Sequence, residues 1–425
     1  MVETGAWRRR AWLAGMAAAV AAPLHRASAA TSITLTVAAY PAVDAIVKAA
    51  LPAWRQRHPD VAVNVVSRQY GDHHTAMTTA LSTSVYLPDV MALEASYLGR
   101  FSTGGGLDRL SLPPYDGGAL QSRFVPYAWS SALNPRGELV AVPTDIGPGT
   151  MLLRRDLLAR AGLAAAYLQP SWEAYVAAGA RIKAATGAYL ISNAQALKDI
   201  LIRTGIGPGE GLYFDRDSRV LVNSPRFVRA FELAREVRRQ RLDARVNAWS
   251  NEWAEAFRRG RLATELSGAW MVGQMANWVA PDTRGQWEAA HLPGQTFVGY
   301  GGTFYAIPRR SEPARKAMAW ALIRLLTLDP TLQLAAFKAE DAFPALLDVH
   351  EAPFFDEPLP FLGGQPARRL WRDAARRITP VQVHKQNNFA DEVVGTELDN
   401  VMDRGKPIAE ALDDAERLLQ RRAHR

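Results

Sequence analysis

The chain has 425 residues and contains no cysteine. This absence excludes a disulfide framework, a thiolate metal site and a thiol nucleophile. The G-x-S-x-G pattern of serine hydrolases and the phosphate-binding Walker loop are missing as well. Hydrophobic content of 48% and charged content of 22% are those of an ordinary globular chain, which has to be stabilised by packed cores.

A membrane-spanning run is also missing. The apolar stretch Ala11–Ala22 is too short to cross a bilayer, but it follows Arg8-Arg9-Arg10 and precedes the small residues Ala27-Ser28-Ala29. We therefore expect residues 1–29 to be a signal peptide, either of the twin-arginine type or an ordinary secretory signal. Because no cysteine follows, we expect no lipid anchor, and we predict an exported, soluble periplasmic protein.

The positive charge does not indicate a nucleic-acid partner. The formal net charge is +8, and removal of residues 1–29 lowers it to about +5. The arginines are scattered over predicted helices and interleaved with acidic residues, which is typical of solvated helix faces. No DNA- or RNA-binding motif accompanies them, so no nucleic acid is expected as a partner.

The 396 residues that remain alternate strand and helix signals and are enough for two domains. Apolar residues alternate over 33–39, are nearly continuous over 61–66, and recur over 90–93. Helical patterns separate these stretches, which favours an α/β domain with a mostly parallel sheet. The continuous run over 61–66 predicts a strand buried on both faces. Later segments are richer in helix: Ser171 is a plausible N-cap, and Gly187 is placed to end its helix.

A passage near residue 145 differs from the rest. A short apolar strand over 139–142 leads into Pro143, and a second apolar stretch begins after Gly149. The glycines and prolines between them, around Asp145, predict a turn with unusual backbone freedom.

Four separated segments resemble the extracellular solute-binding proteins of ABC importers, specifically their sugar-binding branch. The segments are LPAWRQRHPDVAVNVV with LPDVMALEASYLGRFSTGGGLDRL, the Pro143–Pro148 passage with Arg155-Asp156, Phe257–Ala263 with Ser267-Gly268-Ala269-Trp270, and Gly301-Gly302-Thr303 with Ala306-Ile307-Pro308. The resemblance covers most of residues 32–420. One departure is Met151-Leu152-Leu153-Arg154, where the family usually carries an aromatic residue, so the identity of the sugar is not predicted.

The resemblance implies a type II periplasmic-binding-protein fold with two α/β lobes and a ligand cleft between them. We expect residues 30–145 with 303–350 in the first lobe, and 146–302 with 351–425 in the second. It further implies a monomer without cofactor or catalytic activity, which passes a small carbohydrate to the transmembrane permease subunits of an importer.

A sugar site needs aromatic plates for the apolar faces of the ring and charged or amide groups for its hydroxyls. The resemblance makes Trp270 the plate and Asp145 an acceptor; the alternatives are a core tryptophan and a turn aspartate. Glu94 ends a predicted strand, where ligands of open α/β sheets collect. The remaining candidates are Gly302, Thr303, Tyr40, Tyr70 and Asp72. Trp249 and Trp253, spaced by four, are interpreted as helix core.

Three alternatives remain open. An exported carbohydrate-active hydrolase would need two carboxylates, for which Asp72, Glu94, Asp145 and Glu265 are available. A metal carrier would rest on Asp72-His73-His74, although adjacent histidines cannot easily reach one ion and are more often solvent-facing. A polyamine carrier of the same fold would use the same combination of aromatic rings and acids.

Overall fold

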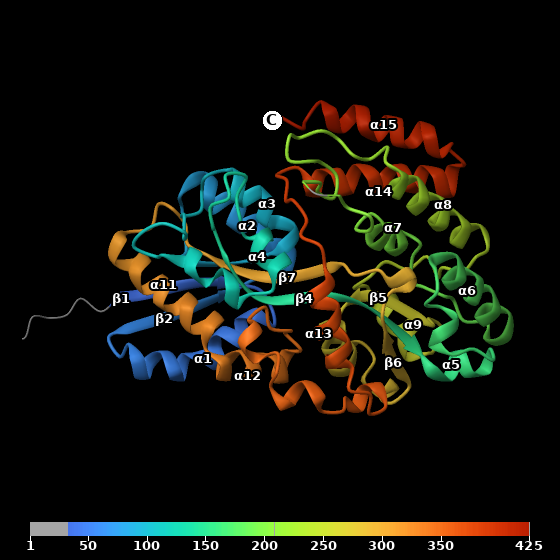
Figure 1. The fold of residues 1–425 in the computed structure, drawn as a ribbon, viewed down its shortest axis with the longest axis horizontal. Helices are drawn as coiled ribbons and strands as arrows, with labels where there is room; N and C mark the ends of the chain where they lie inside the picture. Colours follow the sequence, from blue (N-terminus) through green and yellow to red (C-terminus); the bar gives the residue numbers. More distant parts are fainter. Residues whose placement is uncertain (1–32, 208, 425) are drawn as a thin grey trace, which may run out of the picture. The chain divides into compact units, whose positions relative to one another are not determined.

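A seven-stranded sheet organises the residues that the computed structural model describes, 33–207 and 209–424 (Figure 1). Its strands are β1 (Ile33–Ala39), β2 (Val61–Ser67), β3 (Val90–Glu94), β4 (Val142–Arg154), β5 (Thr264–Gly268), β6 (Trp287–Ala290) and β7 (Gly299–Ala306). They lie in the order β2-β1-β3-β7-β4-β5, and β6 also pairs with β4. The expected signal peptide, residues 1–29, lies outside the described residues.

The sheet is mixed. β1 pairs in parallel with β2 and β3, as the alternation of strands and helices predicts. β7 pairs antiparallel with both β3 and β4, and β5 and β6 pair antiparallel with β4. The prediction of a mostly parallel sheet, made from the first three strands, is confirmed for them, whereas the later strands pair antiparallel. β2 lies at the edge, and Val63 and Val65 are only partly buried, so the prediction of a strand buried on both faces is wrong.

β4 is one long strand where the sequence predicts a turn. Its first part, to Pro148, pairs with β7, and its second part, from Gly149, pairs with β5 and β6. Neither Gly147 nor Gly149 has a positive φ, so neither glycine serves a turn. Pro143 and Pro148 are accommodated because the β4–β7 register shifts beside each of them.

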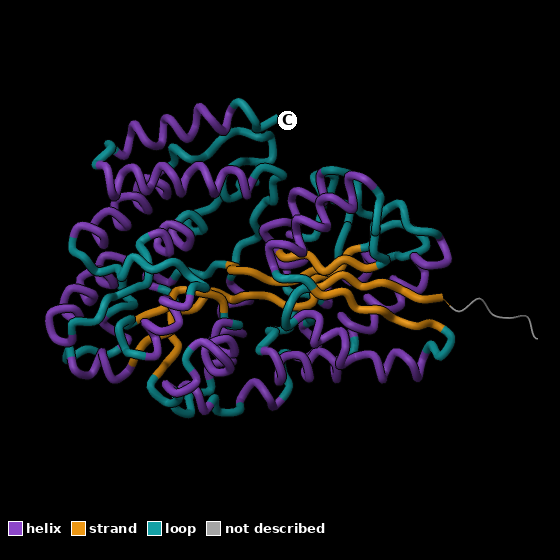
Figure 2. Tube along the Cα trace, turned by 180° about the vertical axis from the view of Figure 1, so that it is seen from behind, coloured by secondary structure: helices purple, strands orange, loops and turns teal. Residues whose placement is uncertain are grey.

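Helices cover both faces of the sheet (Figure 2). They are α1 (Val43–Arg57), α2 (Tyr70–Thr83), α3 (Ala95–Thr103), α4 (Pro126–Ser131), α5 (Arg155–Arg160), α6 (Trp172–Thr186), α7 (Gln195–Leu201), α8 (Pro225–Arg239), α9 (Asn251–Arg258), α10 (Met271–Gln274), α11 (Pro313–Leu328), α12 (Pro330–Glu340), α13 (Ala367–Arg377), α14 (Asn387–Arg404) and α15 (Ile408–Gln420). The predicted caps of α6 are confirmed: the Ser171 hydroxyl accepts the Ala174 N–H at 3.1 Å, and Gly187 is left-handed. Among the described residues, no helix combines the length and the apolar character needed to cross a membrane.

Two hydrophobic cores form on the sheet. One extends from β1 and β3 to α9 and α13, and the other lies among α5, α6, α7, α8, α14 and α15. Successive residues of β4 contribute to different cores, because side chains alternate across a strand: Leu152 belongs to the first, and Met151 and Leu153 to the second. The second half of β4 therefore carries a core on each of its faces.

The buried Lys198 forms ion pairs that join helix α7 to the C-terminal helix α14. Lys198 of α7 is 2% exposed, and its Nζ lies 2.8 Å from an Asp391 oxygen on α14 and 2.5 Å from Asp199. The Tyr213 hydroxyl donates to the same Asp391 oxygen at 2.6 Å. Burial acts to lower the pKa of Lys198, but the neighbouring carboxylates outweigh it and raise the pKa well above its usual value. The ion pairs therefore join α7 to α14 within the second core, and α14 also contacts α3.

We predict that Lys198→Met will destabilise the protein by about 1.5–3 kcal/mol, because it removes the charge-assisted hydrogen bonds of a buried ammonium group, whereas Asp199 and Asp391, with side chains 30% and 57% exposed, stay hydrated. Arg57→Ala is the control: it breaks an ion pair with Asp329 in which the arginine side chain is 56% exposed, and we expect a loss below about 1 kcal/mol. Urea unfolding of both variants measures the difference. Equal losses would mean that the ion pairs of Lys198 do not anchor α14.

Candidate ligand-binding site

Thr303 lies at the centre of a polar cluster where four strands approach one another. In the sheet it is the register partner of Glu94 on β3 and of Asp145 on β4. Tyr40 follows the last residue of β1, and Tyr70 opens α2. The fold therefore brings together residues that are up to 263 positions apart in the chain.

Hydrogen bonds connect the side chains of this cluster. The Tyr40 and Thr303 hydroxyls lie 2.8 Å apart and share a hydrogen bond in which either can be the donor. Hydrogen bonding from Thr303 also acts to lower the pKa of the Asp145 carboxyl. On the other side of β7, the Tyr70 hydroxyl donates to Glu94 at 3.0 Å, and the Ser96 N–H donates to the same oxygen at 2.8 Å.

Burial sets the protonation of this cluster. It raises the pKa of Asp145 to about 6; the bonds from Thr303 oppose this increase and the charge of Glu94 adds to it. Burial and the Asp145 charge also raise the pKa of Tyr40, which keeps its hydroxyl a donor. At neutral pH Asp145 is therefore mostly a carboxylate, which can accept hydrogen bonds from a ligand.

The Trp270 ring packs against the backbone of two glycines, Gly147 and Gly268. Its indole N–H donates to the Tyr300 carbonyl at 2.9 Å, and the side chain is half-buried. A Cβ added to Gly147 would lie 1.8 Å from that carbonyl oxygen and 2.8 Å from the indole nitrogen, and one added to Gly268 would lie 2.3 Å from the nitrogen. These glycines are needed because the ring lies directly over the backbones of β4 and β5.

Further tryptophans continue from Trp270. Trp249 is near-parallel to it, with centroids 5.9 Å apart and planes at 16°, and Trp278 continues from Trp249 at 5.9 Å and 27°. Trp253 is fully buried, which confirms its interpretation as helix core. For Trp249 that interpretation is wrong: it precedes the N-cap of α9, Ser250, and is 52% exposed.

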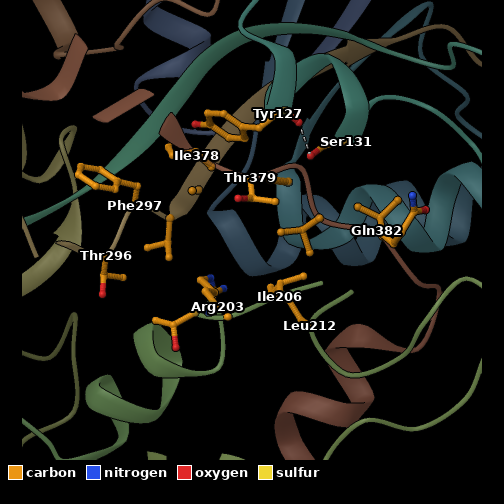
Figure 3. A pocket seen from close by; sticks show the side chains of 18 of the residues that line it. Tyr127, Ser131, Arg203, Ile206, Leu212, Thr296, Phe297, Ile378, Thr379 and Gln382 are labelled. Atoms are coloured by element: carbon orange, nitrogen blue, oxygen red, sulfur yellow. Dashed lines mark hydrogen bonds between the residues drawn. The ribbon is translucent and has the colours of Figure 1, made fainter. Parts of the chain in front are cut away.

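A cavity of about 410 Å³ adjoins the cluster at Glu94 and Gly301. Figure 3 shows side chains that converge on it from α4, from the loop after α7, from residues 296–297 and from the segment after α13; they include Tyr127, Ser131, Arg203, Phe297, Ile378 and Gln382. Arg203 lies 5.1 Å from the Tyr300 ring centroid, so Tyr300 connects the cavity wall to Trp270. The Tyr127 hydroxyl and Asn387 Oδ1, both in the wall, are buried without a hydrogen-bond partner.

The cluster contains most of the predicted site residues. Hydrogen bonds join Tyr40 to Thr303 and Tyr70 to Glu94, and Asp145 is the register partner of Thr303. Trp270 lies near Glu94, because both side chains approach Gly301. Gly302 has φ +128°, and a Cβ there would lie 2.9 Å from the Asp145 carbonyl oxygen, so this glycine permits close packing of β4 on β7. Thr303 is only 3% exposed and positions Asp145. The ligand-binding role of all these residues remains a prediction.

The Asp72-His73-His74 motif lies differently from expectation. Both histidines are fully buried, not solvent-facing. His73 Nε2 bonds the Ala92 carbonyl at 2.7 Å; His74 bonds the Tyr70 carbonyl through Nδ1 and accepts the Glu94 N–H at Nε2, and burial lowers the pKa of His74 to about 4. Asp72 is exposed and has no contact with the cluster among the interactions of the described residues. Those residues contain no group of three or more side chains able to hold a metal ion.

Sequence reasoning missed Arg203, Tyr127, Phe297 and Asn387, which lie in helices and loops without a recognisable motif. It also missed why Gly147 and Gly268 are glycines. The signal for Gly268 was present, since a glycine two residues before a tryptophan is compatible with a ring folded back over the strand.

The family described as bacterial extracellular solute-binding protein matches residues 49–359. The chain belongs to this family. The lactose-binding protein of Rhizobium radiobacter is 24% identical over 386 residues, which cover 87% of each chain. The arabinooligosaccharide-binding protein of Bacillus subtilis (strain 168) is 22% identical over 281 residues, 63% of this chain and 64% of the relative.

Solved structures show the same fold. An extracellular solute-binding protein of family 1 superposes with a TM-score of 0.80 at 24% identity, over 92% of this chain and all of that one. The ABC-transporter-associated binding protein of B. animalis subsp. lactis Bl-04, in complex with β-1,6-galactobiose, gives a TM-score of 0.76 at 21% identity, over 92% and 97% of the two chains. The predicted two-lobed periplasmic-binding-protein fold is confirmed. The family and these relatives are binding proteins, so the hydrolase alternative is not supported.

We predict that Gly147→Ala will destabilise this solute-binding protein by about 3 kcal/mol or more, because the new methyl group would force β4 away from Tyr300 and Trp270. The control is Gly118→Ala, where the nearest atom to the added Cβ is 3.9 Å away. Urea unfolding followed by tryptophan fluorescence measures both. A Gly147→Ala protein as stable as the control would contradict the described packing of β4 on β7.

Proposed function

We propose that this protein binds an oligosaccharide between its two lobes in the periplasm and delivers it to the permease subunits of an ABC importer. The observation that carries the proposal is the convergence of the Trp270 ring with the Glu94 and Asp145 carboxylates beside a 410 Å³ cavity. Aromatic rings and carboxylates are the two kinds of group that a pyranose requires. The names of the relatives agree with this ligand class.

The wall of the cavity supports a ligand rich in hydroxyl groups. The lining includes the side chains of Thr296, Thr379 and Gln382, whose hydroxyl and amide groups can exchange hydrogen bonds with a ligand. Because the lining combines Phe297 and Ile378 with such polar groups, it suits a ligand with apolar faces and a polar edge. A ligand of disaccharide size, at about 0.3 kcal/mol for each of about two dozen heavy atoms, would bind with micromolar affinity.

The division into lobes belongs to the same proposal. We place residues 30–145 with 303–350 in the first lobe and 146–302 with 351–425 in the second, so that β4 and β7 both cross the boundary near Asp145 and Thr303. A signal peptide over residues 1–29 would export the chain without a lipid anchor, and a monomer suffices for delivery to the permease.

We predict that a thermal-shift panel of mono-, di- and oligosaccharides will identify ligands that stabilise the mature protein, by about 2.7 kcal/mol at 100 times the dissociation constant. Trp270→Ala should lose most of this shift while keeping its circular dichroism spectrum. Tyr86→Ala is the control, because Tyr86 is 93% exposed and precedes β3, whereas Glu94 lies at the opposite end of that strand. Stabilisation by spermidine but by no sugar would favour the polyamine alternative instead.

We further predict that sugar affinity will fall about five- to tenfold between pH 7 and pH 5. Asp145 accepts hydrogen bonds best as a carboxylate, and its pKa of about 6 means that acidification over this range protonates it in the free protein. Asp145→Asn should bind more weakly at pH 7 and lose this pH dependence. Isothermal titration calorimetry at both pH values tests it, and an unchanged pH profile in the variant would remove Asp145 from the site.

A further inference from the structure

Trp249 and Trp278 form an exposed aromatic surface that continues from Trp270. The centroid spacing of 5.9 Å in each pair exceeds the contact distance of about 3.5–4.0 Å between stacked carbon atoms. The near-parallel rings are therefore displaced sideways, like steps, and each leaves part of a face uncovered. Trp249 is 52% exposed and Trp278 45%, values far from the burial that large aromatic side chains usually reach.

The backbone of Trp249 holds its ring in this position at a cost. Its φ is +68°, in the left-handed region that aromatic residues rarely adopt. The ring packs against the buried Trp253, with centroids 5.3 Å apart. Half of this large apolar side chain nevertheless stays in water although its backbone is strained, so we expect a further benefit of the arrangement in a complex.

Trp278 is also fixed before any ligand arrives. It lies in the π-helical turn Met275–Val279, a distortion that is frequent at functional sites. Its indole N–H donates to Gln274 Oε1. Arg258 of α9 donates to the carbonyls of Trp278 at 2.8 Å and Val279 at 2.7 Å, which locks the turn.

The two rings line one groove of about 590 Å³ along α9. The rest of its lining is largely polar or charged, and includes Asn251, Glu252, Glu255, Arg258 and Arg261. Aromatic faces beside amide, carboxylate and guanidinium groups repeat the combination present at Trp270. Trp270 is not part of this lining, but its ring is near-parallel to that of Trp249 at 5.9 Å, which places the groove next to Trp270.

We propose that Trp249 and Trp278 are an outer platform for the further sugar units of a linear oligosaccharide whose first unit stacks on Trp270. This inference rests on the proposed function and narrows it to ligands of three or more sugar units. A monosaccharide or disaccharide can use Trp270 and the carboxylate cluster, but only a longer chain reaches Trp278.

The test is isothermal titration calorimetry with arabino-, galacto- and malto-oligosaccharides of two to six units. For the series that binds, we expect affinity to rise between two and four units. Trp278→Ala should weaken the tetrasaccharide about three- to tenfold and the disaccharide less than twofold, as expected when one stacking contact is lost. Trp278→Phe, which keeps a ring, should retain most of the tetrasaccharide affinity, and Trp249→Ala should behave like Trp278→Ala.

Affinity independent of chain length, or a Trp278→Ala variant that binds all lengths as the unchanged protein does, would overturn the outer platform while leaving sugar binding intact. An equal loss for disaccharide and tetrasaccharide would overturn it too, because the variant would then act on the inner site. Failure of every saccharide, disaccharides included, would overturn the proposed function itself and the platform with it.

Discussion

The antiparallel contact between β4 and β7 is the interaction on which the rest of the structure depends. Both strands lie in the middle of the sheet, and β4 alone continues into the pairing with β5 and β6. Gly147 and Gly302 make the contact possible, since a side chain at either position would strike the opposite backbone. The same close approach places Thr303 against Asp145 and the Tyr300 carbonyl beneath the Trp270 indole. The close packing of β4 on β7 therefore fixes both the pairing of the strands and the positions of the candidate site residues.

This contact is also where the sheet is least regular. The register of β4 on β7 shifts twice, beside Pro143 and beside Pro148, and each shift interrupts the ladder of hydrogen bonds. Pro143 and Pro148 also have no N–H to donate, so this part of the ladder can form fewer hydrogen bonds than a regular antiparallel pair. Asp145 lies between the two shifts, so the orientation of its carboxylate follows any bend of β4.

The sequence predicts the elements whose signals are local. Alternating apolar residues identify β1, and Ser171 and Gly187 mark both ends of α6, because periodicity and capping depend only on neighbours. Gly147-Pro148-Gly149 is misread as a turn, since the same residues satisfy a turn or a close strand contact, and only the position of β7 decides. Trp249 is misread as core because its spacing of four from Trp253 does not reveal that α9 begins at Asn251. The site residues named from the family resemblance converge, whereas Arg203 and Tyr127 could not be found, because no pattern marks a cavity wall assembled from distant loops.

The groups suited to sugar recognition are divided between different parts of the chain. Hydroxyls and carboxylates come from the ends of β1 and β3 and from the β4–β7 contact, where backbone pairing fixes them. The aromatic rings come from the segment between residues 249 and 278, where a strained residue, close packing on glycines and a π-helical turn fix them. Hydrogen bonds to hydroxyls confer orientation but exchange with water, whereas stacking gains free energy without specifying which hydroxyl points where. In the site that we propose, a ligand that engages both sets has a polar edge and apolar faces, as a sugar ring does.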